Sequence, residues 1–287
     1  MATFFNQATL NFGGSTTASN IVSGELASGI TLTKIAVSRD YSRGDGITYL
    51  VTVTNDGAAP YNALTLTDDL GAFQTTEGGT AYTPLTYVDG SLLYFIDGES
   101  SEPPTAVADG TGLIISGITV PGGSTATLVY EALTNAYAPL ESGATVTNTV
   151  TLSGAGIPEP VSATATVTAR DEAQLSVAKA ICPATVGADG VLTYTFIIQN
   201  SGNVAASGDD LFITDTFTPI LRDISVTLDG APLEINTGYT YDATTGEFAT
   251  VGGVITVPAA TFERDAASGI VSLTPGSVTV TVTGNAF

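Results

Sequence analysis

The segment ITYLVTVTNDG (47–57) recurs in the second half of the chain as LTYTFIIQNSG (192–202), and this repeat decides the fold. Each copy alternates apolar and polar residues and runs into an Asn-X-Gly turn, which is typical of a β-strand. Other segments also match in pairs: LTKIAV (32–37) with SVAKAI (176–181), LTLTDDL (64–70) with LFITDTF (211–217), and VPGGSTATLVYEA (120–132) with TPGSVTVTVTGNA (274–286). The chain therefore consists of two related β-rich units.

The composition supports an all-β fold. Short alternating runs rich in Thr and Val are separated by Gly, Pro, Asn and Asp, and no segment keeps a helical period of 3.6 residues. A chain of 287 residues with 43% hydrophobic residues is long enough for two ordinary cores. We therefore predict two tandem β-sandwich domains.

The second unit is incomplete by comparison with the first. Domain 1 continues into ATVTNTVTLSGAG (144–156) and VSATATVTA (161–169), a predicted terminal hairpin, whereas the matching part of domain 2 is absent before Phe287. Without these two strands, domain 2 has an open sheet edge and an uncovered core. We assign residues 31–172 to the complete domain 1 and residues 173–287 to an incomplete acceptor domain 2.

The missing strands have a counterpart at the N-terminus. ATFFNQATLNFGG (2–14), followed by STTASNIVSGEL (15–26), resembles the terminal hairpin of domain 1, with Asn6 in the place of Asn148 and Leu10 in the place of Leu152. We predict that residues 1–30 form a donor hairpin and a linker, the linker lying at about 28–31. By strand alternation the core-facing residues of the donor strand are Phe4, Asn6, Ala8, Leu10 and Phe12.

The donor segment has two possible destinations. It can fold back onto domain 2 of its own molecule, which gives a closed monomer, or enter domain 2 of a neighbouring molecule. Residues 27–172 separate the two pieces, so donation to a neighbour is geometrically simpler. A heterologous contact of this kind does not close on itself and therefore produces a filament of identical subunits joined head to tail.

The chain has only two lysines, and both lie on the apolar side of a predicted strand. An unpaired ammonium in an apolar interior costs several kcal/mol or loses its proton, so lysines kept there suggest chemistry. Strand alternation also turns an acid and an asparagine toward each core. The two sets are Lys34, Asp68 and Asn148 within domain 1, and Lys179, Asp215 and the donor's Asn6 between subunits.

Lysine, aspartate and asparagine in an apolar core are the groups that an intramolecular isopeptide bond needs. Burial favours a neutral amine, which is a nucleophile, and a protonated carboxyl, which polarises the carboxamide while ammonia leaves. Asp68 and Asp215 would be the autocatalytic acids. The alternative is a buried Lys–Asp ion pair with Asn as a hydrogen-bond partner, an arrangement that is weakly stabilising at best.

Charge and motifs exclude several functions. A net charge of −21 disfavours nucleic acid and anionic membranes as partners. Without histidine, a phosphate loop or a nucleophile elbow, we expect no enzyme beyond single-turnover bond formation, no cofactor and no metal. Cys182, the single cysteine, excludes an intrachain disulfide and is expected to be buried. The N-terminus lacks the pattern of a signal peptide.

The repeated motifs LTKIAV, ITYLVTVTNDG, LTLTDDL and TNTVTLSG resemble a conserved repeat domain of unknown function, the eleventh of its series, found in bacterial surface and appendage proteins. The Lys, Asp and Asn placement is also similar to isopeptide-forming modules of Gram-positive pilins and adhesins. This resemblance implies immunoglobulin-like sandwiches strung into stalks or fibres. This chain differs from some of those modules in having Asp where they have Glu.

The leading hypothesis is therefore a structural subunit of an extracellular, pilus-like fibre that polymerises by donor-strand complementation. Its place would be a cell or spore surface, and the lack of a signal peptide would suit a spore appendage released by lysis. The alternative is an adhesin or ligand-binding stalk module of a bacterial surface, with Tyr82, Tyr87, Tyr94 and Phe95 as a candidate carbohydrate platform.

Overall fold

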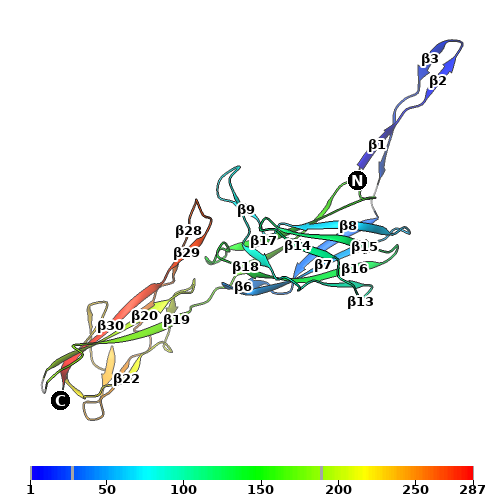
Figure 1. The fold of residues 1–287 in the computed structure, drawn as a ribbon. Coiled ribbons are helices and arrows are strands. Elements are labelled where there is room, and N and C mark those ends of the chain that lie inside the picture. Colours follow the sequence, from blue (N-terminus) through cyan, green and yellow to red (C-terminus); the bar gives the residue numbers. More distant parts are fainter. Residues whose placement is uncertain (1, 27–28, 188–189, 287) are drawn as a thin grey trace. The chain divides into compact units, whose positions relative to one another are not determined.

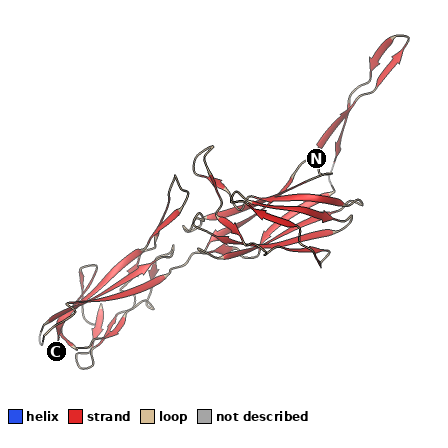
Figure 2. Ribbon diagram, in the orientation of Figure 1, coloured by secondary structure: helices blue, strands red, loops and turns tan. Residues whose placement is uncertain are grey.

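The computed structural model describes residues 2–26, 29–187 and 190–286, and in these ranges the chain forms strands, turns and loops but no helix (Figures 1 and 2). The predicted all-β fold is confirmed. None of the described residues belongs to a helix that could cross a membrane. Met1, Ser28 of the predicted linker and Phe287 lie outside the described residues.

The chain divides into two compact units. Unit 1 comprises Met1–Pro139, Ala144–Ala169 and Asp265–Ile270, and unit 2 comprises Leu140–Gly143, Arg170–Arg264 and Val271–Phe287. The predicted domain boundaries at residues 30 and 172 remain a prediction.

Unit 1 is a sandwich of two sheets. The first has the order β13 (Glu99–Ser101), β12 (Leu93–Ile96), β16 (Thr125–Thr134), β7 (Gly46–Asn55) and β5 (Ile30–Ala36), with β11 (Leu85–Tyr87) also paired to β16. The second has the order β14 (Thr105–Ala108), β15 (Leu113–Val120), β8 (Tyr61–Asp68), β17 (Thr145–Ser153), β18 (Val161–Ala169) and β6 (Asp40–Tyr41). A short pair, β9 (Phe73–Gln74) and β10 (Ala81–Tyr82), also belongs to the unit.

The alternation read from the sequence becomes the two faces of each strand. In β7, Ile47, Tyr49, Val51 and Val53 are all 0% exposed, while the residues between them are partly exposed. The predicted terminal hairpin of domain 1 is present as β17 and β18, and β17 lies between β8 and β18. This hairpin thus closes the second sheet over the core.

Unit 2 has the same first sheet but a shorter second one. The first has the order β19 (Leu175–Cys182), β20 (Val191–Asn200), β30 (Gly276–Ala286), β23 (Leu221–Leu228) and β24 (Ala231–Leu233). The second has the order β22 (Thr214–Thr216), β26 (Glu247–Thr250) and β25 (Tyr239–Tyr241). Two further pairs are β21 (Ala206–Ser207) with β27 (Thr256–Val257), and β28 (Thr261–Arg264) with β29 (Val271–Thr274).

The repeat alignment matches β22 with β8, and β26 holds the place of β15 because each pairs with the matched strand. In unit 1, β8 pairs with β15 on one side and β17 on the other, whereas β22 pairs only with β26 among the described strands. The edge of β22 that corresponds to the β17 side of β8 is therefore free. The first sheet of unit 2 is also uncovered at its β19 edge, because all residues of β19 are exposed.

The N-terminal residues form a hairpin of their own. β1 (Ala2–Asn6) pairs with β4 (Val22–Leu26), and β2 (Thr9–Phe12) pairs with β3 (Ser15–Ala18) across a turn at Gly13 and Gly14, both with positive φ. Residues 7 and 8 interrupt the strand, and here the Ala8 N–H donates to Ser19 Oγ at 3.0 Å. The matching strand β17 has no such interruption.

Cys182 corrects one expectation. We expected a small buried residue, but Cys182 is an exposed free thiol at the end of β19. The physical reason is the position of β19 at the edge of its sheet, where no described strand covers it.

Candidate functional site

In unit 1, the structure brings together the lysine, acid and asparagine that the sequence predicted. Lys34 lies in β5 opposite Val51 of β7, Asp68 ends β8, and Asn148 lies in the middle of β17. Lys34 and Asp68 have side chains that are 0% exposed, and Asn148 is 0% exposed as a residue. The cluster is held by one strand of the first sheet and two of the second.

Asp68 is the centre of this cluster. Its Oδ2 accepts from Lys34 Nζ at 2.9 Å, from Asn148 Nδ2 at 3.5 Å and from the Tyr130 hydroxyl. Its Oδ1 accepts from the Leu70 backbone N–H at 2.8 Å. One carboxylate therefore contacts both the amine and the carboxamide nitrogen, which are the two groups between which a proton must pass if an amide exchanges.

Burial sets the protonation of Lys34. Desolvation lowers the pKa of Lys34 below its ordinary value, and the charge and hydrogen bond of Asp68 raise it in part. Because desolvation is the larger effect, the neutral amine is more accessible here than in water. A neutral amine carries the lone pair that a nucleophile needs.

Two tyrosines, which the sequence reasoning missed, complete the cluster. Lys34 Nζ lies 4.6 Å from the centre of the Tyr49 ring and 5.9 Å from that of Tyr130. Burial is also the main cause that raises the pKa of both phenols. The repeat contained a signal for Tyr49, because ITYLVTVTNDG and LTYTFIIQNSG both have a tyrosine at their third position. These residues are Tyr49 in unit 1 and Tyr194 in unit 2.

Unit 2 contains the equivalent lysine–acid pair in an open setting. Lys179 Nζ forms an ion pair with Asp215 Oδ2 and lies 4.6 Å from the centre of the Tyr194 ring. The side chains of Lys179 and Asp215 are 42% and 18% exposed, against 0% for both partners in unit 1. The expectation of a buried Lys179 is therefore wrong for this chain taken alone, because unit 2 has no described strand in the place of β17 and β18.

An apolar groove of about 450 Å³ lies beside this pair. Its walls come from β19, from β20 and from the segment that leads into β22. The lining residues are Leu175, Ser176, Val177, Lys179, Phe196, Ile198, Leu211, Phe212, Ile213, Thr214 and Asp215. The apolar residues on the lysine side of β19 are open to solvent here, with Leu175 44% and Val177 64% exposed.

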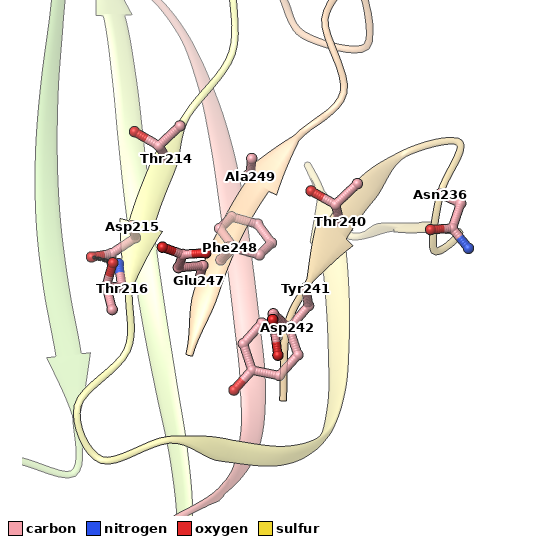
Figure 3. Close-up of a pocket in the computed structure, with 10 residues that line it drawn as sticks. All are labelled: Thr214, Asp215, Thr216, Asn236, Thr240, Tyr241, Asp242, Glu247, Phe248 and Ala249. Carbon is pink, nitrogen blue, oxygen red and sulfur yellow. Dashed lines mark hydrogen bonds between the residues drawn. The ribbon is translucent and has the colours of Figure 1, made fainter. Parts of the chain in front are cut away.

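A second, polar pocket of about 550 Å³ lies along the small sheet of unit 2 (Figure 3). It is lined by Thr214, Asp215, Thr216, Asn236, Thr240, Tyr241, Asp242, Glu247, Phe248 and Ala249. Asp215 thus borders both cavities. The described residues include no cluster of three or more carboxylate, histidine or cysteine side chains suited to a metal ion.

The predicted donor residues lie in the N-terminal hairpin and are exposed. Asn6 is opposite Val22 in the β1–β4 pair, and the ring of Phe4 packs against Gly24. Phe4 is 54%, Leu10 66% and Phe12 85% exposed, and Ala8 is exposed too. Their counterparts in β17 are buried, with Val150 and Leu152 both at 0%.

Comparisons with known proteins give the following similarities. No protein-family model matches the chain, that of the numbered repeat series included, and no curated protein matches it. Among solved structures, the chain is similar to the pilus backbone RrgB from Streptococcus pneumoniae, with 14% identity, a TM-score of 0.36, and 86% of this chain and 55% of that chain covered. It thus spans only about half of that protein.

Two further similarities concern bacterial proteins. The major pilin subunit BcpA of Bacillus cereus has 10% identity and a TM-score of 0.35, with 96% of this chain and 73% of that chain covered. The collagen-binding domain from a Staphylococcus aureus adhesin has 9% identity and a TM-score of 0.31, with 49% of this chain and 99% of that chain covered. At these values the similarities carry no information on function.

Proposed function

We propose that this protein is the structural subunit of an extracellular, pilus-like fibre at a cell or spore surface. In this proposal the N-terminal hairpin of one subunit fills the groove of unit 2 in the next, so that identical subunits join head to tail. A Lys179–Asn6 isopeptide bond joins neighbouring subunits, and a Lys34–Asn148 bond braces unit 1. The protein would have no enzymatic role beyond these single-turnover reactions.

The observation that carries the proposal is the free edge of β22 beside a partly exposed Lys179–Asp215 pair. Unit 1 shows what the same position looks like when it is filled, because β17 pairs with β8 there and places Asn148 against Asp68. A strand added to β22 would satisfy its free backbone groups, which is the usual energetic basis of strand addition.

Unit 1 also supplies the expected register. Val150 lies opposite Asp68, and Leu152 lies opposite Leu66. By the repeat alignment, Ala8 of the donor would lie opposite Asp215, and Leu10 opposite Ile213. Asn6 then takes the place of Asn148, two residues from the position opposite the acid and on the same face.

The bond formation balances without any further reactant. The ammonium group of Lys179 gives one proton to Asp215, and the neutral amine attacks Cγ of Asn6. The Nζ–Cγ bond forms and the Cγ–Nδ2 bond breaks. A second amine proton passes through the carboxyl group to the departing nitrogen, which leaves as ammonia.

The test is denaturing electrophoresis of purified material together with intact-mass measurement. We expect boiling-resistant ladders in the wild type and none in Asn6→Ala or Lys179→Ala, and a mass lower by about 17 Da for each ammonia lost. Subunits of full calculated mass would contradict both bonds. Deleting residues 1–26 tests the non-covalent part, because polymers that still form after the deletion would contradict donor-strand addition.

A further inference from the structure

Two buried polar atoms in the unit 1 cluster have no hydrogen-bond partner: the Tyr49 hydroxyl and the Asn148 carbonyl oxygen Oδ1. Leaving a buried donor or acceptor unpaired costs roughly 1–3 kcal/mol, so such atoms in a native structure need an explanation. Both atoms belong to the cluster around Asp68, because Lys34 Nζ lies 4.6 Å from the centre of the Tyr49 ring. The same Nζ and Asn148 Nδ2 lie 2.9 and 3.5 Å from Asp68 Oδ2. One is an available donor and the other an available acceptor.

The contact of Asn148 with Asp68 indicates that Oδ1 is the atom that needs a hydrogen-bond donor. Its Nδ2 lies 3.5 Å from Asp68 Oδ2, so the nitrogen that must leave already faces the acid. When the Lys34 amine attacks Cγ, negative charge develops on Oδ1. This oxygen is shielded from water, since Asn148 is 0% exposed, and needs a protein donor.

We propose that the Tyr49 hydroxyl donates a hydrogen bond to Oδ1 of Asn148 and stabilises the negative charge that forms during isopeptide bond formation, and that Tyr194 does the same for Asn6 in the joint between subunits. This inference rests on the proposed crosslinks. It assigns to each cluster a fourth residue, an oxyanion donor, beside the nucleophile, the acid and the carboxamide.

The repeat separates this role from that of the other buried tyrosine. Tyr49 and Tyr194 occupy the same place in the two copies, and each lysine lies 4.6 Å from the centre of its ring. Tyr130 pairs with Tyr49 across β16 and β7, and the residue that pairs with Tyr194 across β30 and β20 is Val282. The contact of Tyr130 with Asp68 is therefore not shared by the two clusters, whereas the tyrosine on the lysine side is.

The experiment measures the rate of covalent joining for Tyr194→Phe, which removes one oxygen and keeps the ring against Lys179. Wild-type and variant subunits are followed by time-resolved denaturing electrophoresis. The matched control is Tyr241→Phe, which also removes a phenol oxygen in unit 2, but one whose partner is the Leu221 backbone. Reversible association is measured in parallel with each variant in an Asn6→Ala background.

We expect Tyr194→Phe to slow covalent joining roughly 100- to 1000-fold, as loss of one oxyanion donor does elsewhere. Its reversible association should stay within about twofold of the parent, and Tyr241→Phe should join at the wild-type rate. In unit 1, Tyr49→Phe should leave a fraction of molecules heavier by about 17 Da, the ammonia not yet lost.

Three results overturn the inference, and they can be told apart. If the wild type crosslinks and Tyr194→Phe crosslinks as fast, the tyrosine has no such role and the proposed function stands. If the wild type itself loses no ammonia at either lysine, the crosslinks and the inference both fail. A variant that joins slowly only because it associates weakly also counts against the role.

Discussion

Truncating Leu10 to alanine should weaken the association of subunits while leaving the stability of the free subunit almost unchanged. In the free subunit Leu10 is 66% exposed, so its loss should change the free energy of unfolding by less than about 0.5 kcal/mol. In the proposed joint it takes the place of Leu152, which is 0% exposed in the filled sheet of unit 1. A Leu-to-Ala change in such a site costs about 2–4 kcal/mol. Association should therefore weaken roughly 30- to 1000-fold.

The measurement is sedimentation equilibrium in an Asn6→Ala background, where joining is reversible. Thr9→Ala is the matched control, because Thr9 is exposed and lies on the opposite side of the same strand. We expect the control to associate like its parent. Leu10→Ala that associates as tightly as the control would refute the predicted register. A Leu10→Ala monomer that is itself strongly destabilised would refute the reasoning that exposed Leu10 contributes little to the stability of the free subunit.

Three further predictions concern the unit 1 cluster and the groove of unit 2. Replacing Lys34 with Met and Asp68 with Leu together should destabilise unit 1 by about 4 kcal/mol in calorimetry, as expected for loss of a covalent link across a long loop; a buried ion pair alone would give a neutral or stabilising exchange. Because burial raises the pKa of Tyr49 above 10.0, the folded state holds that proton more tightly than the unfolded state. The free energy of unfolding should then fall as pH rises above about 10, and Tyr49→Phe should reduce this slope in urea titrations; an unchanged slope would contradict it. Val177→Asp, at a position 64% exposed in the groove, should leave the monomer folded but abolish sedimentation of polymers, and polymers of wild-type length would exclude this groove as the acceptor.

The repeat comparison predicted much of the fold because the alternation of residues along one strand determines which of its side chains are buried. The alternation in ITYLVTVTNDG predicted the buried face of β7, and the position of Lys34 among apolar residues predicted its burial. The match of Asp68 with Asp215 likewise predicted two lysine–acid pairs, and both are present. Period-two patterns of this kind translate directly into strand faces.

Other features depend on what lies across the core, which a pattern along one strand does not contain. Lys179 has the same local sequence pattern as Lys34, yet its exposure depends on strands that are absent from the described part of unit 2. Cys182 was misjudged for a related reason, since its burial depends on the position of β19 at a sheet edge. Tyr130 contacts Asp68 only because the two sheets pack face to face, so the spacing of residues along the sequence did not predict this contact.

The free edge of β22 and the separate N-terminal hairpin also give the subunit a direction. In the proposed fibre each subunit carries one of each, so a linear polymer of any length would keep one unfilled groove and one unused hairpin. The two ends of the proposed fibre would thus be chemically different and could be blocked independently. A peptide with the sequence of residues 2–14 would stop growth at the groove end, whereas a protein that supplies only unit 2 would stop it at the hairpin end. Growth and length of the proposed fibre could then be controlled at one end without affecting the other.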